Sequence, residues 1–137
     1  MTPILITIVL TVLAAVVVVL TRVRLSKNQG EAAGRLSIPK DLLNTHTGVG
    51  LLALAAWTVF LVTQNALIGW IGLALWWVVV VAGLLILARW VPAKGRHSSG
   101  PVVDTWGEGP GLSVLAHVGL LVGVIIFTAL LALGRLS

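Results

Sequence analysis

The chain has 137 residues, of which 58% are hydrophobic and only 9% are charged, and its mean hydropathy is +1.10. Soluble domains carry about 25% charged residues, so this composition excludes an ordinary soluble domain and indicates a polytopic membrane protein. The lack of cysteine excludes disulfides, thiolate metal sites, iron–sulfur clusters and cysteine nucleophiles.

The first apolar segment covers residues 3–21 and suits one membrane crossing, which takes about 20 residues. No basic residue precedes it, and no small-residue cleavage site follows a charged region. We therefore expect a retained first span and not a cleaved signal peptide. A basic loop is expected over residues 22–41, where Asn28-Gln29-Gly30 and Gly34 are typical of irregular backbone.

The longest apolar run, residues 42–88, contains no Asp, Glu, Lys or Arg and is interrupted only by Thr63-Gln64-Asn65. Its length predicts two spans, at about 42–63 and 67–88, joined by a tight hairpin. A second polar loop, rich in Gly and Pro, is expected over residues 89–111. The fourth span is predicted at about 112–133, with Gly134 as its C-terminal cap.

These segments predict a single transmembrane domain over residues 1–137, an all-α integral membrane four-helix bundle with up-down-up-down topology. Eight of the nine Lys and Arg residues lie in the two long loops, and none lies in the hairpin. Positive residues favour the cytoplasmic side, so we expect both long loops in the cytoplasm and both termini outside. The location expected is the cell (inner or plasma) membrane. The same loop positions explain the net charge of +5 without nucleic-acid binding.

Two histidines, His46 and His117, are the only ionisable residues inside the predicted spans. Ionisable groups in a membrane are costly and often functional. If the second helix starts near Ile38 and the fourth near Pro110, both histidines lie roughly 11–12 Å along their helices. The second and fourth spans run in the same direction, so we expect the two histidines at similar depth in one leaflet.

One imidazole from each of two helices is the arrangement that a bis-histidine haem needs. Small residues near each histidine, Gly50 after His46 and Gly119 after His117, would let a macrocycle approach. In its span count and these residues the chain resembles the small four-helix membrane cytochromes b. The resemblance implies a b-type haem with His46 and His117 as axial ligands of its iron, and electron transfer linked to the quinone pool.

A structural role for the histidines remains an open alternative, because an imidazole in a membrane can hydrogen bond to a neighbouring hydroxyl. Thr45, Thr47 and Ser113 are available for such bonds. The two readings differ in geometry. Haem binding requires both imidazoles to approach one iron, whereas structural histidines can point apart.

Small residues on the third and fourth spans are spaced for helix packing. Gly119 and Gly123 form a GxxxG motif that Ala116 extends by about one turn, and Gly69, Gly72 and Gly83 lie on the third span. Such faces let helices approach closely, either inside this bundle or against another subunit. The sequence leaves both possibilities open.

No catalytic constellation is apparent, since the four acidic residues lie in loops or at span edges and the pair Ser113 and His117 lacks a third member. We therefore expect a small non-enzymatic accessory subunit that docks on a larger membrane complex, respiratory or transport. Its partners would be membrane lipids and other integral membrane subunits. The alternative is a b-type haem electron-transfer protein with one bis-histidine haem.

Overall fold

The computed structural model describes residues 2–27, 40–90 and 110–136. Within these ranges the secondary structure consists of α1 (Pro3–Lys27), α2 (Lys40–Thr63), α3 (Ala66–Trp90) and α4 (Pro110–Ala132). Each helix contains a segment long and apolar enough to cross a membrane. The prediction of an all-α protein with four membrane-spanning helices is confirmed at this level. The expected loop structure and the proposed start of the second helix near Ile38 lie outside the described residues.

The helices extend beyond the apolar segments that predicted them. The membrane-compatible part of α1 is Pro3–Leu20, yet the helix continues to Lys27. Lys and Arg are good helix formers, so a helix does not have to stop where the hydrocarbon region stops. For the same reason α3 continues past Ala88, the last residue of its apolar segment, and ends at Trp90.

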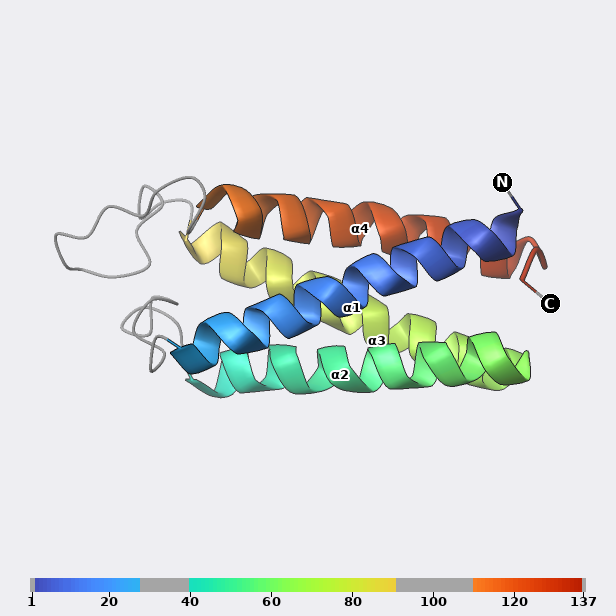
Figure 1. The fold of residues 1–137 in the computed structure, drawn as a ribbon, viewed down its shortest axis with the longest axis horizontal. Coiled ribbons are helices and arrows are strands. Elements are labelled where there is room, and N and C mark those ends of the chain that lie inside the picture. The colour runs from blue at the N-terminus through green and yellow to red at the C-terminus, as the bar shows by residue number, and fades with distance from the viewer. Residues whose placement is uncertain (1, 28–39, 91–109, 137) are drawn as a thin grey trace, which may run out of the picture.

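The four helices form an elongated bundle with both termini at one end (Figure 1). Helix α3 is central to the packing, because it makes its most extensive contacts with α2 and the next most extensive with α4. Helix α1 crosses the bundle and touches α2 and α4 more sparsely. The backbones of α2 and α4 do not approach each other closely in the described residues. These two helices therefore lie on opposite sides of α3.

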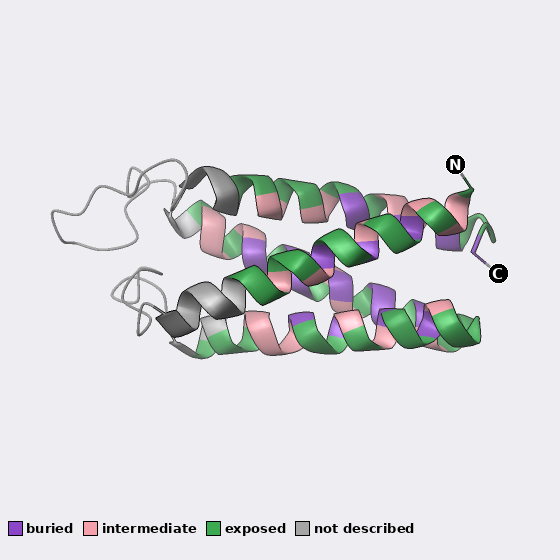
Figure 2. Ribbon diagram, viewed as in Figure 1, coloured by how far each residue is buried: buried purple, intermediate pink, exposed green. Residues whose placement is uncertain are grey.

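The outward surface of the bundle is strongly apolar. Large hydrophobic side chains are exposed along every helix, among them Leu20 at 62%, Val62 at 78% and Leu115 at 68% (Figure 2). Helices that are apolar all round are typical of membrane spans. Together with the four candidate spans, this surface indicates a multi-pass membrane protein whose helices contact lipid.

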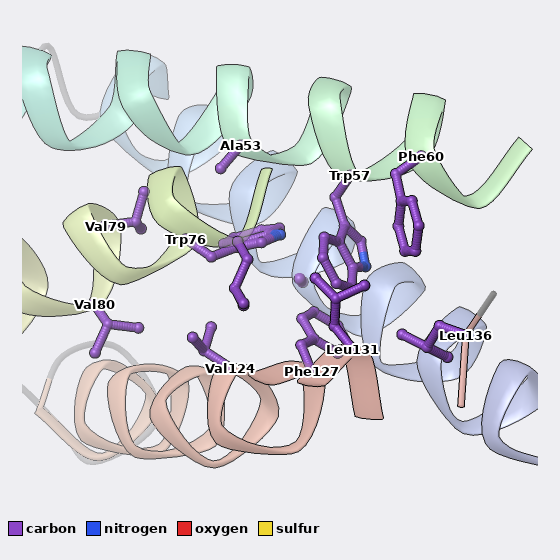
Figure 3. Packing of buried hydrophobic residues seen from close by; sticks show 12 residues of the cluster. Ala53, Trp57, Phe60, Trp76, Val79, Val80, Val124, Phe127, Leu131 and Leu136 are labelled. Atoms are coloured by element: carbon purple, nitrogen blue, oxygen red, sulfur yellow. The ribbon is translucent and has the colours of Figure 1, made fainter. Parts of the chain in front are cut away.

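An aromatic cluster holds α2, α3 and α4 together. The side chains of Trp57, Phe60, Trp76 and Phe127 are at most 1% exposed, and they converge between the helices (Figure 3). Trp57 stacks on Phe127 with ring centroids 4.6 Å apart and meets Phe60 in a tilted contact at 5.1 Å. Aromatic pairs in these geometries stabilise beyond the area that they bury.

The hairpin between α2 and α3 is built by the polar residues that interrupt the apolar run. Gln64 adopts a left-handed backbone conformation with φ of 54°, which ends α2. The Asn65 side-chain oxygen accepts hydrogen bonds from the backbone N–H groups of Leu67 and Ile68, at 3.0 and 3.3 Å. Asn65 thus caps the start of α3, whose first N–H groups have no partners within the helix.

Candidate functional site

The structure brings His46 of α2 and His117 of α4 together. Their ring centroids lie 6.0 Å apart, and their planes differ by only 17°. Both residues are half-buried. The backbones of α2 and α4 stay apart, so the two imidazoles meet in the space between opposite helices of the bundle.

Gly83 of α3 lies beside both rings of this histidine pair. A Cβ atom placed on Gly83 would lie 2.6 Å from Cδ2 and 3.0 Å from Nε2 of His117, and 3.1 Å from Cε1 of His46. Real Cβ atoms almost never come within 3.0 Å of another heavy atom, so the α3 backbone can approach both rings only because residue 83 is glycine.

The sequence reasoning gave Gly83 only a packing role, although a signal for its place was available. In an antiparallel helical hairpin, residues equally far from the turn lie at the same level, because every helical residue rises by the same 1.5 Å. His46 precedes Gln64 by 18 residues, and Gly83 follows Asn65 by 18 residues. Counting outward from the polar corner would therefore have placed Gly83 opposite His46.

One nitrogen of the pair is buried without a hydrogen-bond partner. This atom is Nδ1 of His46, and Nε1 of Trp57 and Nε1 of Trp76 share the same condition. An unsatisfied buried polar atom costs about 1–3 kcal/mol, so such atoms call for an explanation. A purely structural histidine would be expected to have this nitrogen paired, for instance with a threonine. The hydroxyl of Thr47, however, donates to the carbonyl of Asn44 at 3.2 Å.

The donors available at the pair fit a haem iron better than a simple metal ion. The described residues contain no group of three or more His, Cys, Asp or Glu side chains. Zinc in proteins takes at least three protein ligands, whereas haem iron brings four equatorial nitrogens and needs only axial ones. With metal–imidazole bonds of about 2 Å, two ring centroids across one metal lie roughly 6 Å apart. The observed centroid distance of 6.0 Å is close to that value. The α3 backbone at Gly83 lies beside the facing edges of both rings, so a macrocycle between them requires α3 to move away.

The other residues proposed to line a cofactor lie further from the rings. A Cβ on Gly50 would meet only Cγ2 of Val79, at 4.0 Å, so this glycine faces α3. A Cβ on Gly119 would meet no atom within 4 Å. Neither position therefore shows the close approach to the imidazoles that Gly83 shows.

The proposed packing residues fall into two groups. A Cβ on Gly72 would lie 3.1 Å from the backbone nitrogen of Trp57, and one on Gly69 would lie 2.8 Å from Cδ2 of Phe60, so both glycines pack between α2 and α3. On α4, a Cβ on Gly123 would meet nothing within 4 Å, as at Gly119, and Ala116 is half-buried. The GxxxG motif is therefore not used for close packing within the described bundle.

A groove between α1 and α2 lies apart from the histidine pair. Its volume is about 290 Å³, and it contains two threonines, Thr11 and Thr58. Both hydroxyls donate hydrogen bonds within their own helices. The Thr11 hydroxyl donates to the carbonyl of Thr7 at 2.7 Å, and the Thr58 hydroxyl donates to the carbonyl of Leu54 at 2.8 Å. The groove is thus mostly apolar, and these two hydroxyls have no proton left to donate to a ligand.

Comparison with known proteins gives no further information about the histidine pair. No protein-family model matches the chain, and no curated protein and no solved structure matches it.

Proposed function

We propose that the chain is a b-type haem electron-transfer protein of the cell membrane, in which His46 and His117 are the axial ligands of one haem iron. The observation that carries this proposal is the pairing of the two imidazoles, 6.0 Å apart, from helices whose backbones do not approach each other closely.

Haem, when bound, supplies a one-electron redox couple whose potential depends on its ligands and their surroundings. The chain's own part is to hold and shield that group. His46 and His117 would hold the iron through their imidazole nitrogens, one from α2 and one from α4. Val79 and Val80, which are 4% and 3% exposed, lie about one turn away on α3 and exclude water from that side.

The test is haem content and the reduced-minus-oxidised visible spectrum of the purified protein, produced with ample haem. We expect the α band of a b-type haem at about one haem per chain, and its loss in His46→Ala and in His117→Ala, because haem iron here needs both axial ligands. His97→Ala is the matched control, since it removes the third histidine and should leave the band unchanged. A wild-type protein without the band, or equal loss in the control, would refute the proposal.

A role as an accessory subunit is a second candidate, and it is compatible with haem binding. It is favoured by Gly119, which is exposed on α4 and where a helix of another membrane subunit could approach closely. This role predicts a stoichiometric partner after mild-detergent extraction from native membranes, and release of that partner by Gly119→Leu. Recovery of only the free chain would count against it.

We also propose that the two long loops are cytoplasmic and that both termini lie outside. The support is the distribution of basic residues, eight of nine of which lie in or next to those loops.

A further inference from the structure

The groove between α1 and α2 opens on the surface that contacts lipid. Of the residues that line it, Ile8, Val12 and Thr58 are exposed. The helices on either side are long and apolar enough to cross a membrane, and they expose large apolar side chains along their lengths. The groove is therefore continuous with the lipid interface. The hydrocarbon core of a bilayer holds no water, so hydrocarbon fills a groove at this position.

The groove occupies the half of the bundle that holds the hairpin. On α2, Leu61 lies two residues and Leu54 nine residues from the end of the helix, which is about 3 Å and about 14 Å. On α1, Ile8 and Ala15 lie five and twelve residues from the start of the helix. The N-terminus and the hairpin lie at the same end, toward which α1 and α2 diverge (Figure 1). The groove thus runs from that end to about the middle of the bundle, and its length is close to the thickness of one leaflet, about 15 Å of hydrocarbon.

The size and chemistry of the groove fit a single hydrocarbon chain. Over a length of about 14 Å, its volume of about 290 Å³ gives a mean cross-section of roughly 20 Å², which is that of one extended hydrocarbon chain. A sterol or a quinone ring is wider. The hydroxyls of Thr11 and Thr58 both donate to carbonyls of their own helices, so they have no proton left for an oxygen atom of a ligand. The lining therefore favours an apolar chain over a polar head.

Helix α1 contacts the rest of the bundle only sparsely. In lipid no hydrophobic force holds one apolar helix against another, so the association of α1 depends on van der Waals contacts. Where α1 and α2 diverge, a hydrocarbon chain between them contacts both helices and supplies these contacts. We propose that an acyl chain of a phospholipid from the hairpin-side leaflet occupies this groove and holds α1 against α2. This role does not depend on the proposed haem function.

The experiment measures how tightly the purified protein retains dioleoyl phosphatidylcholine, by native mass spectrometry from detergent. It compares the wild type with Ala15→Leu, which would fill the groove, and with Ala55→Leu. Ala55 is the matched control because it is exposed on α2 outside the groove. We expect one retained lipid in the wild type and in Ala55→Leu. Retention by Ala15→Leu should be about tenfold weaker, because leucine would occupy the volume that the chain needs.

Three results would overturn the proposal. The first is a wild-type protein that retains no phospholipid, and the second is equal retention by all three proteins. The third is displacement of the phospholipid by an isoprenoid quinone at equal concentration, which would assign the groove to a different occupant.

A second measurement needs only the wild-type protein, and so covers the case in which Ala15→Leu does not fold. The protein is placed in phosphatidylcholine vesicles that carry a photoactivatable diazirine in the middle of one acyl chain, and the cross-linked residues are identified by mass spectrometry. Ile125 is the reference, because it is 50% exposed on α4 and lies about 11 Å from the end of that helix at Ala132, within the depth of the groove. We expect several-fold more cross-links at the groove residues than at Ile125. An even distribution over the two surfaces would contradict the proposal.

Discussion

Single residues on α2 and α3 face each other in one consistent register. Trp57 and Gly72 are each 7 residues from the Gln64–Asn65 turn, and Phe60 and Gly69 are each 4 residues from it. In both pairs a large ring lies opposite a glycine, as His46 does opposite Gly83. The sequence identified these glycines as packing residues. Predicting which residues of α2 they contact also requires the turn to be assigned to Gln64 and Asn65.

Gly72 is the described glycine of α3 at which an added Cβ would meet backbone atoms of α2. We predict that Gly72→Ala lowers stability by about 1–3 kcal/mol, because the new Cβ would press on backbone atoms of Trp57, which cannot rotate away. The measurement is thermal unfolding in detergent. Gly48→Ala has the same gain in helix propensity, and should unfold at or slightly above the wild-type temperature. Equal unfolding temperatures for the two variants would contradict the prediction.

At the level of the helices, hydropathy predicted the four spans but not where the helices end. The length of an apolar segment matches the thickness of the bilayer and does not determine where the helix ends. Helix α1, for example, continues through charged residues to Lys27. Nor did the sequence show which helix is central. Helices that are apolar all round carry little periodic signal, so the position of α3 between α2 and α4 depends on side-chain packing.

A side-chain hydrogen bond joins α3 and α4 within the described part of the spans. Nε1 of Trp77 donates to the hydroxyl of Thr128 at 3.1 Å, and that hydroxyl donates to the carbonyl of Val124 at 2.7 Å. A double-mutant cycle with Trp77→Phe and Thr128→Val should give a coupling of about 0.6 kcal/mol, the average for such bonds in membranes.

Unfolding in mixed detergent micelles measures this coupling. Trp70→Phe is the control for loss of an indole, because Trp70 is 50% exposed at the hairpin end. It should show no coupling with Thr128→Val. A cycle in which the effects of Trp77→Phe and Thr128→Val simply add would show that the hydrogen bond contributes nothing to stability.

For the whole molecule, the sequence predicted that both histidines lie at similar depth, but it could not place them side by side. Equal depth follows from residue counts along two helices. Lateral proximity depends on the order of helices around the bundle, and on a glycine in a third helix that lets both rings approach. The site therefore depends on α2, α3 and α4 together.

The orientation of the molecule in the membrane can be tested with single cysteines, since the natural chain has none. Ala66→Cys places a thiol at the exposed hairpin, and Ser98→Cys places one in the second long loop. A membrane-impermeant maleimide added to intact cells should label residue 66 and leave residue 98 unlabelled until the cells are opened, because basic loops stay on the cytoplasmic side. The reverse pattern would refute the proposed orientation.

The depth of the histidine pair has an electrical consequence. His46 is 6 residues from the start of α2 at Lys40 and 17 from its end at Thr63, or about 9 Å and about 26 Å along the helix. The longer path holds the aromatic cluster and no second pair of histidines within the described residues. Electrons would therefore enter and leave a haem at this site from the end of the bundle at which α2 begins, near Lys40. Such turnover carries no net charge across the bilayer, and so neither generates a membrane potential nor is retarded by one.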